Sequence, residues 1–146
     1  MSAGPADPQV ARLVAWFEGL RPEDLLELGQ YYAEEACFKD PFSDVHGLAA
    51  VQAVYAHMFE ALDEPRFVVR EVVQQGDHCF LTWDFLFRFK RGDRTVQTVH
   101  GASHLHFGPD GRITRHRDYW DAAEELYEKL PVIGTLMRWL KKRAAS

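Results

Sequence analysis

Long apolar segments and cysteines are both scarce in this sequence. No stretch approaches the roughly 20 apolar residues that cross a bilayer, and the first residues have neither the basic nor the apolar region of a secretory signal. The two cysteines, Cys37 and Cys79, are too few for a disulfide framework, and neither belongs to a paired metal motif. Both have apolar neighbours and are predicted to be buried thiols on strands. We therefore expect a soluble, reduced, cytoplasmic protein.

Clustered positive charge is also missing until the very end of the chain. The formal net charge is −5, so the contiguous positive field that displaces counterions from nucleic acid is absent, and we expect no nucleic-acid partner. Hydrophobic residues make up 47% and charged residues 27% of the 146 positions, as in ordinary globular proteins. This length predicts one domain over residues 8–143, with flexible ends at 1–7 and 144–146.

Three helices are predicted in the first part of the chain. Asp7 and Pro8 form an N-cap and a first helical position, and apolar residues then recur on one face as far as Leu20. A second helix starts at Arg21-Pro22 and includes Tyr32. A short strand, 36–40, follows, and the third helix comes after Gly47. The apolar positions of the third helix are Leu48, Val51, Tyr55, Met58 and Leu62.

The apolar period changes after Pro65 and predicts an antiparallel meander. Its four strands are expected at 66–74, 78–90, 95–107 and 112–120. Because a meander has one face to bury and three helices precede it, we predict an α+β fold in which a curved antiparallel sheet forms a cone around the helices.

A C-terminal amphipathic helix is predicted after the meander. Asp121 caps its start in a capping box with Glu124, and Pro131 restarts it as Val132–Arg143. Its basic and apolar sides would suit a membrane surface, but packing of the apolar side on the domain is favoured, because one such helix with four cations binds membranes weakly.

Two segments carry a resemblance to a known family. They are Tyr32-Ala33-x-x-Ala36-x-x-x-Asp40-Pro41-Phe42 before Gly47, and Asp110-Gly111-Arg112-Ile113 before Tyr119-Trp120. They resemble ketosteroid isomerases, in the nuclear transport factor 2-like superfamily that includes polyketide cyclases. The tail Tyr127-Glu128-x-Leu130-Pro131-x-Ile133-Gly134 is similar to that of a bacterial SnoaL-like subgroup.

The resemblance implies roles for several residues. Asp40 matches the family's catalytic base, and Trp120 matches an aromatic pocket wall. Ser103 stands where the family has an oxyanion-binding aspartic acid, and Trp16 or Phe17 where it has a tyrosine. A serine hydroxyl donates one hydrogen bond, but the paired donors are absent, which argues against steroid isomerisation.

The residues around Asp40 allow two interpretations. Strand alternation puts it on the face of Ala36 and Phe38, where loss of solvation would favour a general base. Alternatively, Asp-Pro marks a turn and Asp40 caps a loop.

Two groups of histidines are predicted on opposite faces of the sheet. His116, Asp118 and Trp120 share one face, where His116 and Asp118 would relay or supply a proton, unless this is the exposed face of an edge strand. His100, His104 and His106 lie opposite the more apolar face of Gly101, Ser103 and Leu105. They are therefore expected to face solvent or a second copy in a homodimer, rather than a metal. An aromatic row, which core packing explains, contains Trp83, Phe85, Phe87 and Phe89.

Together these features predict a small-molecule enzyme without metal or organic cofactor. Asp40 would act as base, His116 with Asp118 would handle the proton, and Ser103 would stabilise oxyanion charge on an apolar, partly aromatic or polycyclic substrate. The predicted substrate-binding residues are Trp16, Phe17, Phe38, Tyr55, Phe59, Gly101, Leu105 and Trp120. The alternatives are a non-catalytic ligand-binding or dimerisation module and an epoxide hydrolase, for which Arg88 and Arg115 are the candidate arginines.

Overall fold

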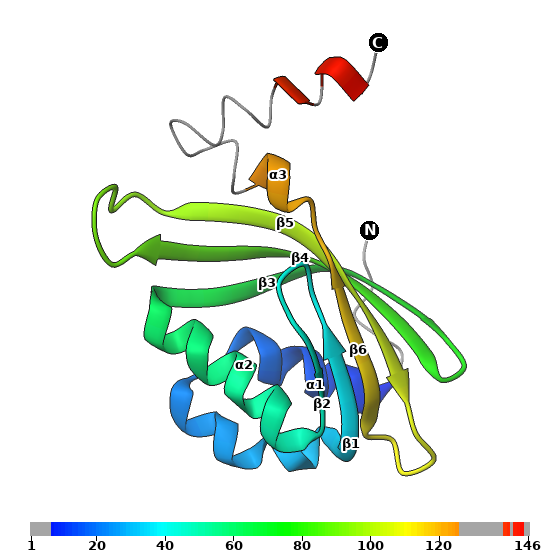
Figure 1. Cartoon of the computed structure of the whole chain (residues 1–146). Helices are drawn as coiled ribbons and strands as arrows, with labels where there is room; N and C mark the ends of the chain where they lie inside the picture. The colour runs from blue at the N-terminus through cyan, green and yellow to red at the C-terminus, as the bar shows by residue number, and fades with distance from the viewer. Residues whose placement is uncertain (1–6, 126–138, 141, 145–146) are drawn as a thin grey trace.

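A computed structural model describes residues 7–125, 139–140 and 142–144 (Figure 1). Two helices, a 3-10 helix and the first two strands come before a four-stranded meander, and a short helix follows it. In chain order the elements are α1 (Pro8–Glu18), η1 (Pro22–Gln30), β1 (Tyr32–Lys39), β2 (Asp44–His46), α2 (Leu48–Ala61), β3 (Leu62–Gln75), β4 (His78–Phe89), β5 (Gln97–Phe107), β6 (Ile113–Tyr119) and α3 (Ala122–Glu125).

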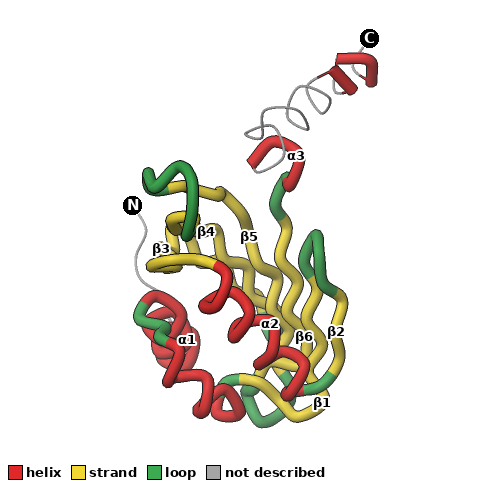
Figure 2. Tube along the Cα trace, turned by 60° about the vertical axis from the view of Figure 1, so that its left-hand side comes forward, coloured by secondary structure: helices red, strands yellow, loops and turns green. Residues whose placement is uncertain are grey.

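The six strands form one curved sheet in the order β2-β1-β6-β5-β4-β3. In Figures 1 and 2, α1 and α2 lie on the same side of this sheet, which bends around them. The predicted α+β architecture is thus confirmed. One pair, β1 with β6, is parallel. The meander starts with β3 at the far edge of the sheet and returns to β1. Its last strand, β6, runs in the same direction as β1.

The first helix begins as predicted, and the second differs. The Asp7 side chain accepts a hydrogen bond from the Gln9 backbone N–H at 2.8 Å, which caps α1. The second helix is a 3-10 helix that ends at Gln30, and its buried residues Leu25 and Leu28 are spaced by three, which suits 3-10 geometry. Tyr32 therefore belongs to β1, which is longer than the predicted strand 36–40.

The boundary between α2 and β3 also differs from the prediction. Gly47 precedes α2 with a φ of 98°, a conformation that favours glycine. The helix ends at Ala61, and Leu62 is already extended, so β3 starts before Pro65 rather than after it. Proline is tolerated there because β3 is an edge strand and Pro65 falls in the irregular stretch of its pairing with β4, between Asp63 and Arg66. The short strand β2 was not predicted.

The hydrophobic core lies between the helices and the concave face of the sheet. Residues from α1, η1 and α2 pack against the inward side chains of β1, β4, β5 and β6. In the aromatic row, Trp83 and Phe87 are buried and Phe85 and Phe89 are half-buried, as core packing predicts. Cys79 is fully buried, which raises its pKa to about 11. The prediction for Cys37 is wrong in part, since this thiol is half-buried and lies 2.9 Å from Nδ1 of His46.

The chain after the sheet is described only in part. Asp121 caps α3, since its side chain accepts a hydrogen bond from the Glu124 N–H at 3.0 Å. Most of the predicted helix Val132–Arg143 lies outside the described residues. Within the part of the chain that the structure describes, no helix is both long enough and apolar enough to cross a membrane.

Candidate functional site

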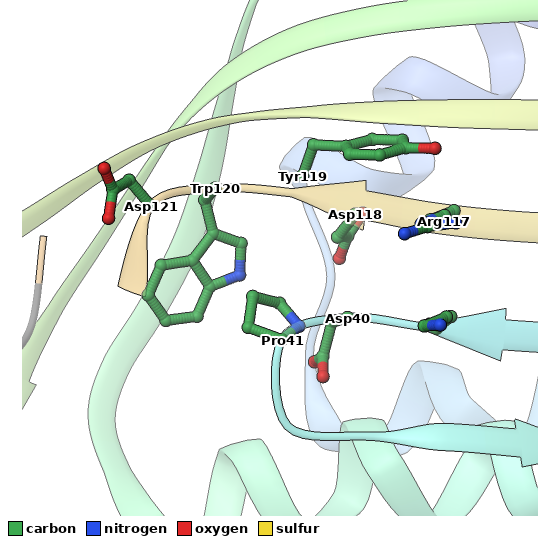
Figure 3. Close-up of a pocket in the computed structure, with 8 residues that line it drawn as sticks. Asp40, Pro41, Arg117, Asp118, Tyr119, Trp120 and Asp121 are labelled. Carbon is green, nitrogen blue, oxygen red and sulfur yellow. The ribbon is translucent and has the colours of Figure 1, made fainter. Parts of the chain in front are cut away.

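Two neighbouring hollows meet at Asp118. The inner cavity, of about 20 Å³, lies in the cone between the helices and the sheet, and its polar lining consists of Tyr55, Ser103, His116 and Asp118. The outer pocket, of about 610 Å³, lies at the edge of the sheet where the parallel strands β1 and β6 both end, and Asp40, Asp118 and Trp120 are among its lining residues (Figure 3). Asp118 lines both, so it stands between the two hollows.

Cross-strand pairing between β5 and β6 brings the polar residues together. Ser103 is the register partner of Asp118, and Leu105 is the partner of His116. Oδ1 of Asp118 lies 2.5 Å from the Ser103 hydroxyl, which donates to it, and 2.6 Å from Nε2 of His116. Ser103 accepts a hydrogen bond from the indole N–H of Trp83 at 2.9 Å. The orientation of the Asp118 carboxylate is therefore fixed by His116 and Ser103, and both of these side chains are almost fully buried.

Gly101 allows the Trp83 ring to reach this position. The two residues are partners on β5 and β4. A Cβ atom on Gly101 would lie less than 3.0 Å from three ring carbons of Trp83. The structure shows that Gly101 makes room for the indole, and its predicted contact with substrate stays a prediction.

Two tyrosines complete the buried network on the other side of His116. The Tyr32 hydroxyl lies 2.6 Å from Nδ1 of His116 and 2.8 Å from the hydroxyl of Tyr55. Both phenols are buried, and burial is the main cause that raises the pKa of each well above its ordinary value. Both therefore keep their protons at physiological pH. The result is a continuous hydrogen-bonded chain in the order Tyr55, Tyr32, His116, Asp118, Ser103, Trp83.

Asp40 has a different environment from Asp118. Its Oδ1 accepts hydrogen bonds from the backbone N–H groups of Phe42 and Ser43, at 2.8 and 2.6 Å. It is half-buried and lines the outer pocket, and Figure 3 shows its side chain beside that of Asp118. The prediction of a buried Asp40 in an apolar wall is wrong. Asp40 caps the turn after β1, which is the alternative that the Asp-Pro sequence left open.

The other predicted substrate-binding residues divide into three sets. Phe17 and Tyr55 line the inner cavity, and the buried Phe38 ring contacts the His116 ring edge to face at a centroid distance of 4.8 Å. Trp120 lines the outer pocket and contacts Phe42 edge to face. The third set packs in or against the hydrophobic core and is not part of either lining: Trp16, Phe59 and Leu105.

Some residues of the cavity lining and of the network were not identified from the sequence. Trp83 was assigned to the core, and Tyr32 was placed on a helix. Strand alternation alone would not have placed Tyr32 inward, because Glu34 is exposed and the register shifts between Tyr32 and Cys37. Three further missed residues line the apolar side of the inner cavity: Phe67, Val69 and Leu81. Five others line the outer pocket: Lys39, Pro41, Arg117, Tyr119 and Asp121.

Within residues 7–125, the arginines and histidines outside the network make no second centre. Arg115 is exposed and Arg88 pairs with Glu64, so neither lies beside the inner cavity. His104 and His106 alternate with the buried Ser103 and Leu105, as predicted. Among the described residues, no group of three or more His, Cys, Asp or Glu side chains is placed to hold a metal ion.

Comparison with known proteins gives a family profile and many similar structures. The profile of the SnoaL-like domain family matches residues 13–116. A search of curated proteins found no match. A hypothetical protein with a ketosteroid isomerase-like fold from Catenulispora acidiphila, crystallised with trimethylamine, superimposes with a TM-score of 0.70 at 19% identity, over 84% of this chain and 92% of that chain.

Two further structures share the fold. A putative SnoaL-like polyketide cyclase from Jannaschia sp. CCS1 has a TM-score of 0.69 at 17% identity, covering 85% of this chain and 93% of its own. An LEH-like epoxide hydrolase from M. tuberculosis has a TM-score of 0.67 at 16% identity, covering 83% and 89%. At these identities the similarity concerns the fold.

Proposed function

Because this chain belongs to the SnoaL-like domain family, we propose that it is an enzyme that moves a proton on a hydrophobic substrate, in the manner of an isomerase or cyclase. The resemblance noted in the sequence is thereby confirmed at the level of family and fold. The observation that supports the proposal is the position of Asp118, a hydrogen-bonded carboxylate between a buried polar network and an open pocket.

Asp118 is the general base in this proposal. Among the described residues, its two side-chain hydrogen bonds both fall on Oδ1. Oδ2 is therefore the atom left to take a proton from a carbon acid. Buried donors that fix a carboxylate reduce the rotational freedom lost when the reacting groups align. The Ser103 hydroxyl proton is directed to Asp118, so Ser103 orients the base instead of stabilising an oxyanion.

The size of the two hollows supports a substrate position in the outer pocket. The inner cavity of about 20 Å³ has room for roughly one water molecule or methyl group. The bulk of an aromatic or polycyclic substrate would therefore lie in the outer pocket against Trp120, with the reacting carbon at Asp118. The putative polyketide cyclase from Jannaschia, which shares the fold, is consistent with a substrate of this kind.

Proton exchange with an enolisable bicyclic ketone, 2-tetralone, tests the proposal. In D2O the wild-type protein should increase the rate of deuterium incorporation at the α carbon, followed by proton NMR. Asp118→Asn keeps the shape and removes the proton acceptor, so it should reduce the enzyme-dependent rate by about 100-fold or more. Asp40→Asn, the matched comparison in the same pocket lining, should lose much less of the rate than Asp118→Asn, because an asparagine oxygen also caps the turn.

Two other outcomes would contradict this assignment. If Asp40→Asn lost the activity and Asp118→Asn kept it, Asp40 would be the base. If ligand-observed NMR showed 2-tetralone bound while the wild-type exchange rate equalled that of buffer, the chain would be a non-catalytic binding module, the second candidate for this fold.

A further inference from the structure

The proton inventory of the buried network determines how His116 is protonated. Three polar atoms lie in a row: the Tyr55 oxygen, the Tyr32 oxygen and Nδ1 of His116, with separations of 2.8 and 2.6 Å. Each of these two contacts needs one proton. The two phenols supply two protons, because burial keeps both hydroxyls in their neutral form.

Among the described side chains, only one arrangement satisfies both contacts and every hydroxyl. If Nδ1 carries no proton, Tyr32 donates to Nδ1 and Tyr55 donates to Tyr32. If Nδ1 carries a proton, Tyr32 must turn its own proton toward Tyr55, whose proton then needs another acceptor. Among the described residues, Tyr32 is the only hydrogen-bond partner of the Tyr55 hydroxyl. A buried hydroxyl without an acceptor costs about 1–3 kcal/mol, so the first arrangement is favoured.

The other side of the ring agrees with this arrangement. Nε2 of His116 lies 2.6 Å from Oδ1 of Asp118. A carboxylate only accepts hydrogen bonds, so Nε2 must carry the proton. The tyrosines and the carboxylate, on opposite edges of the same buried ring, therefore require the same tautomer.

We propose that Tyr32 is a positioning residue that, supported by Tyr55, holds His116 as the neutral Nε2–H tautomer and so makes His116 a fixed hydrogen-bond donor to Asp118. This inference rests on the proposed role of Asp118 as base. It also changes the role predicted for His116. Since Nε2 already carries a proton, it cannot receive another from Asp118, and His116 orients the base rather than relaying its proton.

The tautomer of His116 can be measured without any substrate. In protein labelled with ¹⁵N in histidine, two-bond nitrogen–proton correlation spectra distinguish the Nε2–H form, the Nδ1–H form and the doubly protonated ring. For the wild type at neutral pH we expect only the Nε2–H form, with widely separated ring nitrogen shifts. A spectrum of either other form would overturn the proposal.

Two variants separate the effect of Tyr32 on the His116 tautomer from the effect of Asp118. Asp118→Ala removes the carboxylate, and we expect His116 to stay in the Nε2–H form because Tyr32 still donates to Nδ1. Asp118→Ala combined with Tyr32→Phe removes both constraints, and the two ring nitrogen shifts should move toward each other as the tautomers mix. Unchanged separation in the double variant would show that Tyr32 does not set the tautomer.

A neighbouring tyrosine provides the control for these spectra. Tyr31 stacks on Trp16 and lies outside the network, so Tyr31→Phe in the Asp118→Ala background should leave the His116 shifts unchanged. Backbone spectra report whether each variant is folded, and the wild-type spectrum tests the proposal even if a variant is not. If the wild type shows another form of the His116 ring but still catalyses ketone exchange, this inference alone is rejected. If the wild type shows the Nε2–H form but does not catalyse exchange, the proposed function alone is rejected.

Discussion

At the scale of single residues, Asp40 and Asp118 show what decides the role of a carboxylate. The sequence places both at the end of a strand beside aromatic residues, and this pattern cannot distinguish them. The difference lies in their partners: Asp40 accepts from two backbone N–H groups of its own turn, whereas Asp118 is held by His116 and by Ser103 of the neighbouring strand. Partners across strands depend on register, which a single sequence does not specify.

Gly101 gives the clearest residue-scale prediction for stability. Gly101→Ala would place a Cβ atom against the Trp83 ring and should lower the free energy of unfolding by about 1–3 kcal/mol, the usual cost of overpacking. Urea denaturation measures this change. Gly29→Ala is the matched control: its Cβ would lie 3.4 Å from a flexible Leu48 methyl group, so we expect a much smaller effect. Equal losses in both variants would contradict the close approach of Trp83.

At the scale of elements, the sequence predicts strand faces better than strand partners. The alternation on β5 correctly separates Ser103 and Leu105 from His104 and His106, because the side-chain period of a strand is a local property. The parallel pairing of β1 with β6 and the strand β2 were missed, because they depend on how the chain returns across the sheet. The contact of Tyr32 on β1 with His116 on β6 could not be predicted for the same reason, whereas His116, Asp118 and Ser103 were predicted to share one site.

The outer face of β4 and β5 carries a contact between histidines. Nε2 of His104 lies 2.9 Å from Nδ1 of His78, and the His104 ring stacks on Phe80. The pKa of His104 is lowered from 6.5, mainly by burial and further by the nearby His78, His106 and Arg115. The folded protein therefore binds a proton at His104 less readily than the unfolded chain does.

This asymmetry predicts a pH dependence of stability. The contribution of His104 to the free energy of unfolding is fully present above about pH 6.5, the pKa of the unfolded chain. It is lost as the pH falls from there through the lower pKa of the folded protein. His104→Gln should therefore reduce the fall in unfolding free energy between pH 7 and pH 5, by less than about 1 kcal/mol since solvent screens this half-buried site. Urea denaturation at several pH values measures it, with the exposed His57→Gln as control. An unchanged slope for His104→Gln would contradict the prediction.

At the scale of the whole molecule, the outer face of the sheet is where we expect a second copy to bind. Val73, Phe80 and Tyr119 are exposed there by 61%, 46% and 49%, and an apolar sheet face of this kind is usually covered. We predict a homodimer at micromolar concentration, measured by sedimentation velocity. Phe80→Lys should shift it to monomer, whereas Leu26→Lys on η1 should not. A wild-type monomer under these conditions would refute the prediction.

The parallel pair of β1 and β6 also has a consequence for folding kinetics. Tyr32 and His116 are separated by 84 positions along the chain, and their contact closes a loop that contains every element from β2 to β5. Closing such a loop costs entropy that local contacts do not offset, so this pairing is expected to form late. A partly folded chain without β6 in place lacks the whole network. A ligand that requires Asp118 and His116 would therefore bind only the completed native state and slow its unfolding, without accelerating the steps that build it.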